Sequence, residues 1–395
     1  MRISLMRFMP VALGLAWILP SCAEDAGSGG PVDVSPDPSP IPEVPADAGC
    51  EAGTEGCEPA LSDCASRGFG FCPVAIPNKR PSFTSVWGSR ENDVWVGGTH
   101  GALLHFDGTS WVQTPSDTTQ TIFKIAGRPS GEVWALSSRE VVLHSMGFAG
   151  DSTWKPFEPV EPRNGSQREL LLAAWLPPEG GIWVGGGPYY LLPERATEAD
   201  APTANFWRWN AGATSWTPSM TGKDFFVRGL WSSGADELWA VGGMSTYGRF
   251  TPRYGRALRG VPRAGAVEWT EYDTQAWDDL HAIWGSSSDD VWAVGDRGTV
   301  RHWTNATPKR WAIVDAPTKQ HLRAVWGTGP NDVWVVGDEG TILHYDGTKF
   351  EHVEAEFLDG VAVPNLRGVW GSSARDVWIV GDNIVLHRNA RVEGP

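Results

Sequence analysis

Histidine is the residue type best suited to chemistry in this 395-residue chain, and its spacing is regular. Five of the nine histidines occupy the same position of a sequence repeat, namely His105, His144, His302, His344 and His387. Two further repeats carry arginine at that position, Arg208 and Arg259. An acid stands two residues before a tryptophan in six copies: Asp93, Glu132, Glu237, Asp290, Asp332 and Asp376. This regularity predicts a repeated structural hydrogen bond, because a catalytic or metal site would require one copy to differ from the others.

A second set of cations lies three residues before an earlier tryptophan of the last four copies, at Arg228, His281, Arg323 and Arg367. Arginine suits a carboxylate or another anion, because its planar guanidinium can hold two oxygens at once. The alternative is that each arginine pairs with an acid of the adjoining repeat. If anions bind there, replacing the three arginines with Ala should abolish that binding and leave the fold intact.

Two insertions interrupt the repeat, one from Pro188 to Ala204 and one from Met244 to Tyr254. They hold four of the six tyrosines, and we expect them to emerge on one face of the fold. Their candidate binding residues are Tyr189, Tyr190, Tyr247, Arg249, Arg253 and Tyr254. Binding residues often lie on loops above a rigid scaffold, and Tyr with Arg is typical of interfaces. The alternative is a pair of tolerated surface insertions.

Enzyme motifs do not stand out above the repeat. The sequence shows no nucleophile triad, no paired carboxylates and no phosphate-binding glycine loop, so we predict no catalytic residue, metal or cofactor. A glycan-active enzyme would have to use acids at the loop face, and the candidates are Glu194, Glu198, Asp200 and Asp224.

The elements that position these residues follow a tryptophan repeat. One tryptophan recurs in every repeat, at intervals of 39 to 56 residues: Trp95, Trp134, Trp183, Trp239, Trp292, Trp334 and Trp378. Eight residues before each stands another tryptophan, except for Ala126. Seven such strand-turn-strand units predict an all-β fold, a seven-bladed β-propeller of four-stranded antiparallel blades over residues 66–395. The tryptophans are expected to form its core.

The outer strand of each blade is expected to centre on an aromatic residue: Trp111, Trp154, Trp216, Trp269, Trp311 or Phe350. The seventh unit ends near His387 without such a strand. A ring must close or leave exposed sheet edges. The apolar segment from Phe71 to Ile76 is therefore predicted to supply the missing strand.

The first 22 residues read as an export signal. Arg2 and Arg7 precede a short apolar run, and the segment ending at Cys22 resembles the lipobox of bacterial lipoproteins. That resemblance implies a diacylated Cys22; the alternative is an ordinary signal peptide cleaved nearby. Because Ala23 follows, we expect an outer-membrane anchor. Residues 23–65 are acidic and rich in Pro and Gly, which predicts a disordered stalk between the anchor and the folded body.

Four cysteines lie at the end of the stalk and just after it: Cys50, Cys57, Cys64 and Cys72. In an exported chain they predict two disulfides, with three connectivities open. A zinc site is disfavoured, because the spacings are wide and no histidine lies nearby.

The formal charge of −15 is concentrated in residues 23–65, which hold ten acids and neither Lys nor Arg. The remaining mildly acidic body argues against nucleic acid as a partner, because phosphate binding needs concentrated Lys and Arg.

The text VWGSxxxDVWxVGxxGxILHYDG resembles the BNR-like propeller repeats, which include sialidase-type and photosystem-assembly-factor-like members, found in bacterial lipoproteins. The resemblance covers about residues 80–388 and implies the propeller fold. It does not imply one activity, because such propellers include glycosidases, assembly factors and binding proteins. The sialidase Asp-box SxDxGxxW is not met, since the turn between His105 and Trp111 is one residue shorter.

These patterns together predict a lipid-anchored, monomeric binding or scaffold module. Its partner is expected to be a protein or a glycan at the loop face. The alternative is an extracytoplasmic glycan-active hydrolase or lyase on the same ring.

Overall fold

The computed structural model divides into two compact units, residues 1–57 and 58–395. It describes only residues of the second unit: 64, 67–77, 81–150, 153–160, 169–188, 205–219, 225–234, 237–244, 254–263, 266–306, 309–357 and 362–388. The predicted leader, most of the predicted stalk and the lipidation residue Cys22 lie outside these ranges. Among the described residues, no helix is both long and apolar enough to cross a membrane.

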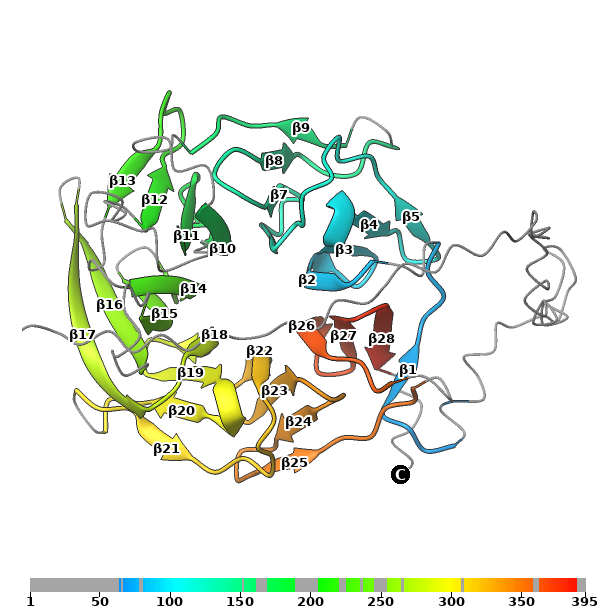
Figure 1. Ribbon diagram of the computed structural model, residues 1–395, viewed down its shortest axis with the longest axis vertical. Helices are drawn as coiled ribbons and strands as arrows, with labels where there is room; N and C mark the ends of the chain where they lie inside the picture. Colours follow the sequence, from blue (N-terminus) through cyan, green and yellow to red (C-terminus); the bar gives the residue numbers. More distant parts are fainter. Residues whose placement is uncertain are drawn as a thin grey trace, which may run out of the picture. The chain divides into compact units, whose positions relative to one another are not determined.

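Seven four-stranded antiparallel sheets form a ring of blades, as the sequence repeat predicts (Figure 1). Each of the first six blades is a continuous stretch of four strands. Blades 1 to 3 are β2 (Phe83–Arg90), β3 (Asp93–Gly98), β4 (Leu103–Phe106), β5 (Trp111–Gln113); β6 (Lys124–Gly127), β7 (Val133–Leu136), β8 (Val142–Ser145), β9 (Lys155–Pro156); and β10 (Glu169–Trp175), β11 (Ile182–Pro188), β12 (Phe206–Trp209), β13 (Thr217–Ser219).

Blades 4 to 6 follow the same order, and blade 7 has three strands from the end of the chain. They are β14 (Phe225–Trp231), β15 (Leu238–Met244), β16 (Gly255–Arg263), β17 (Ala266–Ala276); β18 (Leu280–Ser287), β19 (Asp290–Gly295), β20 (Val300–Trp303), β21 (Ala312–Val314); β22 (Leu322–Gly329), β23 (Asp332–Gly337), β24 (Ile342–Tyr345), β25 (Phe350–His352); and β26 (Leu366–Ser373), β27 (Asp376–Gly381), β28 (Ile384–Arg388).

The fourth strand of blade 7 comes from before the first blade, which confirms the predicted closure. Strand β1 (Phe71–Pro73) pairs antiparallel with β28, with Cys72 opposite His387. Figure 1 shows β1 in blue beside β28 in red. Phe71 is fully buried and packs edge-on against the indole of Trp334 at 5.4 Å. The closing strand is therefore held both by sheet hydrogen bonds and by the core of blade 6.

A disulfide joins Cys64 to Cys72 and ties the closing strand to the segment before it. This gives one of the three connectivities that the sequence left open, with both sulfurs buried beside Glu356. Cys50 and Cys57 lie outside the described residues.

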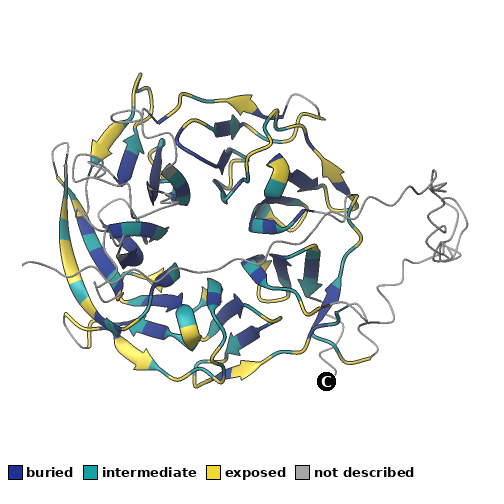
Figure 2. Cartoon of the chain, in the orientation of Figure 1, coloured by how far each residue is buried: buried dark blue, intermediate teal, exposed yellow. Residues whose placement is uncertain are grey.

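The tryptophans on the second strand of each blade are buried, as expected of a core between blades. Figure 2 shows the burial concentrated in the inner strands and the outer strands largely exposed. The outer aromatic does not centre the fourth strand as predicted. It stands at or just before the first residue of that strand in blades 1, 2, 3, 5 and 6, where it packs against the core tryptophan or phenylalanine of the preceding blade in the ring.

The repeated histidine–acid pair is a structural hydrogen bond, as predicted. Nε2 of His302 donates to Oδ1 of Asp290 at 2.6 Å, and His344 does the same to Asp332 at 2.6 Å. The indole of Trp292 stacks on the His302 ring at 3.8 Å and shields it. Blades 1, 2 and 7 repeat this arrangement, and Arg259 pairs with Glu237 in blade 4. Blade 3 differs, because its Arg208 approaches Glu179 instead.

These pairs predict acid-sensitive stability. Burial works to raise the pKa of Asp93, Asp290, Asp332 and Asp376, but hydrogen bonds from His and Ser or Thr outweigh it and hold each pKa below its ordinary value. A carboxyl with a lowered folded-state pKa stabilises the fold above its unfolded pKa of about 3.9, and this stability is lost as the pH falls through the folded value. The melting temperature should therefore begin to fall below about pH 4 and continue to fall toward pH 2.

Thermal melts from pH 7 to pH 2 measure this. The variant Asp332→Asn keeps the shape of the side chain and should show a shallower acid decline than the wild type. A melting temperature that stays level between pH 5 and pH 2 would contradict the role of the pairs.

Candidate functional site

The first strands of all seven blades line a central channel with a volume of about 310 Å³. Its walls come from three successive positions on these strands. The position nearest the mouth carries Thr84, Phe123, Leu172, Arg228, His281, Arg323 and Arg367. The four predicted cationic residues therefore line the channel, along one arc of the ring.

A β-bulge directs each of these four residues into the channel. The pairing register breaks around Arg228, His281, Arg323 and Arg367, and also around Thr84 and Leu172 in the earlier blades. A bulged residue is left out of the ladder, and its side chain is turned away from the regular alternation. The ring of bulges is thus the backbone device that places these side chains at the mouth.

Two of the arginines are held by bidentate ion pairs. Arg323 donates from Nε and Nη2 to the two oxygens of Asp338 at 2.9 and 2.6 Å. Arg367 engages Asp382 in the same way at 2.9 and 3.3 Å. These hydrogen bonds fix the guanidinium planes and leave Nη1 of each arginine on the side away from its acid.

The third arginine, Arg228, is held more loosely. Its Nη2 donates to Oδ2 of Asp279 at 3.2 Å, and its guanidinium lies over the ring of Phe226. The other oxygen of Asp279 is buried without a hydrogen-bond partner. Asp279 reaches this place because Gly243 has no side chain, since a Cβ there would lie 1.9 Å from Oδ1. Arg228 therefore retains the most donor capacity toward a ligand.

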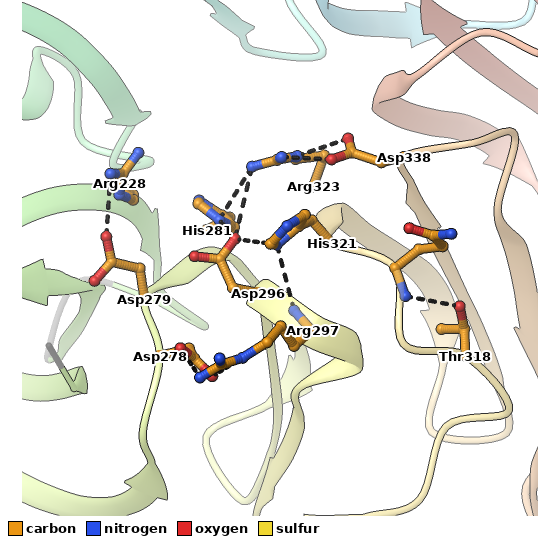
Figure 3. A network of polar contacts seen from close by, with 11 residues as sticks. Arg228, Asp278, Asp279, His281, Asp296, Arg297, Thr318, His321, Arg323 and Asp338 are labelled. Carbon is orange, nitrogen blue, oxygen red and sulfur yellow. Dashed lines mark hydrogen bonds and ion pairs between the residues drawn. The ribbon is translucent and has the colours of Figure 1, made fainter.

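His281 completes the arc and belongs to a cluster around Asp296 in the 3₁₀ turn η5 (Asp296–Gly298). Its Nε2 and the Nδ1 of His321 lie 2.6 and 2.7 Å from the same oxygen of Asp296 (Figure 3). Burial lowers the pKa of His281 and the neighbouring arginines lower it further, and together they outweigh the hydrogen bond to Asp296, which acts to raise it. Burial alone would raise the pKa of Asp296, but the hydrogen bond from His281 and the neighbouring His321 and Arg323 bring it down to about 2.

Figure 3 shows that Arg323 reaches toward His281 as well as Asp338. Nη1 of Arg323 lies 3.2 Å from Nε2 of His281 and 3.8 Å from Asp296. Because that nitrogen of His281 donates to Asp296, it has no lone pair left for the arginine. The protons on Nη1 of Arg323 are thus available to an acceptor in the channel.

The alternative predicted from the sequence, pairing of each arginine with an acid of the adjoining repeat, is wrong for two of the three arginines, although all three do pair with an acid. Arg323 and Arg367 pair within their own blades, and only Arg228 bonds to the segment that leads into the next blade. The acids Asp296, Asp338 and Asp382 each follow a glycine at the end of the second strand, fifteen residues after the cation. This regular offset was a signal in the sequence that pointed to the pairing.

Lys124 is a channel residue that the sequence analysis missed. It occupies the second ring, where the other six blades carry small residues: Ser85, Ala173, Gly229, Ala282, Ala324 and Gly368. None of the described residues forms an ion pair or hydrogen bond with its ammonium. Burial lowers the pKa of Lys124, so the ammonium would gain from an anionic partner. A single lysine among small residues at one repeat position was the sequence signal for it.

Most of the binding residues predicted on the two long loops cannot be placed in the structure. Tyr189, Tyr190, Tyr247, Arg249 and Arg253 lie outside the described residues, as do the candidate acids Glu194, Glu198, Asp200 and Asp224. Tyr254 is described and 41% exposed. It lines a separate depression beside the outer strands of blade 4, not the channel.

The arrangement is suited to binding an anion. Three guanidinium groups and one ammonium line a narrow channel from opposite parts of the ring, and the four nearby aspartates are each bonded to an arginine or a histidine.

Comparison with known proteins supports the fold alone. No family model matches the chain, and no curated protein does. Among solved structures, YCF48 bound to D1 peptide has a TM-score of 0.58 at 15% identity, covering 81% of this chain and 97% of that one. The RRP9 WD40 repeats have a TM-score of 0.59 at 10% identity, covering 80% and 98%. Streptogramin B lyase has a TM-score of 0.53 at 13% identity, covering 80% and 95%.

Proposed function

We propose that this chain is a binding module, anchored to the outer membrane through Cys22, which holds an acidic segment of a protein partner at its channel mouth. The observation that carries this proposal is the asymmetry of the described channel. The scaffold repeats seven times, but cations occupy the bulged position only in the last four blades, and Lys124 lies in the second ring of blade 2. A charge pattern that departs from the repeat is not needed for the fold, because the other three blades form the same bulge or strand without it.

A protein partner is favoured by two considerations. The mouth combines rigid guanidinium groups with an apolar lower ring that includes Val86, Leu230 and Ile283, which suits an acidic residue next to an aliphatic one. YCF48, which shares the fold, is described as bound to a peptide. We propose a monomer because all seven sheets have their four strands, so no blade needs a strand from a second copy of the chain.

The second candidate is a glycan-active hydrolase or lyase, which the likeness in fold to streptogramin B lyase keeps open. It is the weaker candidate, because the four described carboxylates at the mouth are bonded to Arg or His.

Titration calorimetry with the purified body, residues 58–395, tests the proposal. A hexapeptide of alternating Glu and Leu with a free carboxyl terminus should bind, and the same peptide with Lys in place of Glu should not. Binding should weaken as salt rises from 50 to 500 mM, because ion pairs at a mouth are partly screened. Equal binding of both peptides, or turnover of a glycan substrate at the channel, would overturn it.

The anchor is tested separately. In a bacterial host with lipoprotein processing, the full chain should partition into the membrane fraction and incorporate labelled palmitate. Cys22→Ser should lose the label and move to the soluble fraction, since a thioether-linked lipid requires the thiol. A Cys22→Ser protein that stays membrane-bound would contradict lipid anchoring at this residue.

A further inference from the structure

A single tryptophan departs from the packing of all the others. Trp277 is 80% exposed, and every other tryptophan in the described part of the chain is buried or half-buried. It does not belong to the repeat positions that fill the core. An exposed indole leaves a large, flat apolar area in water, and with the depression beside it this area suits a ligand that covers it.

Trp277 stands on a well-anchored backbone. It follows the last residue of β17, and the next two residues are both held, Asp278 by Arg297 and Asp279 by Arg228. The register of blade 4 places Phe225, Met244, Gly255 and Ala276 at one end of the sheet. Trp277 thus lies on the channel-mouth face, at the junction of blades 4 and 5.

A depression of about 680 Å³ lies against this indole. Its lining includes Tyr254, which is 41% exposed, together with Glu271, Asp273 and Gln275. The floor of the depression is rigid because it is hydrogen-bonded to blade 5. The backbone of Asp273 bonds to residues 309 and 311, and Nε2 of Gln275 donates to the carbonyl of Trp311 at 2.9 Å.

The two carboxylates are fixed, and their charge is already compensated. Both oxygens of Glu271 accept from Arg256 at 2.7 Å, and Asp273 lies 3.4 Å from Nε of Arg310. Each carboxylate still exposes about half of its side chain, so lone pairs remain for a further donor.

The chemistry of this depression selects a neutral, hydroxyl-rich ligand. An apolar peptide side chain on Trp277 would strip water from the two carboxylates and give nothing back. An acidic ligand would meet like charges, and a cationic one would find carboxylates already paired with arginine. A pyranose ring offers a C–H face to the indole and hydroxyl donors around its edge to the carboxylates.

We infer that the Trp277 depression is a carbohydrate-binding subsite for a neutral pyranose, with the indole as the stacking platform and Glu271 and Asp273 as acceptors for ring hydroxyls. The subsite is separate from the channel, because none of its residues lines the channel. It also does not depend on the acidic-peptide proposal.

The test uses the body, residues 58–395, and three neutral probes: cellotetraose, mannotetraose and the tetramer of N-acetylglucosamine. Calorimetry should show saturable binding of at least one probe. Trp277→Ala should weaken that binding at least tenfold, and Trp277→Phe, which keeps a ring, should weaken it less than Ala does. The control Ile313→Ala removes another exposed apolar side chain, 59% exposed on blade 5, and should leave binding unchanged.

Failure of this inference is distinguishable from failure at the channel. The variant with Arg323 and Arg367 changed to Ala, which leaves the Arg228–Asp279 anchor in place, should bind the tetrasaccharide as well as the wild type. Absence of binding to all three probes overturns the subsite. So does saccharide binding that survives Trp277→Ala, or a loss of acidic-peptide binding in Trp277→Ala, which would make the indole a protein contact.

Discussion

Phe71→Ala should destabilise the whole propeller by about 3–5 kcal/mol, the usual cost of removing a fully buried phenylalanine from a core. The ring of Phe71 is inaccessible to solvent and packs on Trp334 of blade 6, while its backbone pairs with β28 of blade 7. The substitution therefore weakens the seam between the last two blades. Chemical denaturation followed by tryptophan fluorescence measures the change.

Deletion of residues 66–78 is the more severe form of the same experiment, and the melting temperature should fall by more than ~10 °C. It removes the fourth strand of blade 7 and leaves the edge of β28 without its partner. Ile313→Ala is the matched control, since Ile313 is 59% exposed and lies on β21 of blade 5. An unchanged melt after the deletion would show that ring closure does not depend on β1.

Replacing Arg228, Arg323 and Arg367 together with Ala should lower the affinity for the acidic peptide at least 100-fold. Each hydrogen bond to a charged group contributes about 1.5–3 kcal/mol, and the three guanidinium groups face one narrow channel. Peptide titration before and after the substitutions measures the loss.

The aspartate partners complicate that variant, because Ala leaves Asp338 and Asp382 unpaired. A second variant changes both members of two pairs, Arg323→Gln with Asp338→Asn and Arg367→Gln with Asp382→Asn, which keeps hydrogen bonds without charge. Arg297→Ala is the matched control, since Arg297 is an exposed arginine that pairs with Asp278 outside the channel. If the paired variant folds and binds the peptide like the wild type, the arginines are structural.

The fold followed from the sequence because its signals are local and repeated. Most blades carry the same tryptophan, glycine and acid positions, so seven weak patterns reinforce one another. The missing strand of the seventh unit pointed to Phe71 in the same way, since an open edge requires a partner.

The candidate site was only partly predictable. The arginines could be placed at the channel mouth, but not their partners, because the β-bulge at Arg323 and Arg367 turns each side chain toward the Gly-Asp turn of its own blade. Lys124 escaped notice because Ala126 breaks the tryptophan pattern in blade 2, where the alignment is least regular. Trp277 was hidden among many tryptophans, and only its exposure separates it from them.

The central claim, that a carboxylate enters the channel between the arginine arc and Lys124, is tested most directly at the lysine itself. Reductive ¹³C-methylation labels every lysine side chain, and Lys124→Arg assigns the Lys124 signal in the NMR spectrum. Adding the Glu-Leu peptide should shift the Lys124 signal and raise the pKa of its amine, while the signals of exposed lysines such as Lys349 stay in place. A peptide that binds and leaves the Lys124 signal unmoved would contradict the claim.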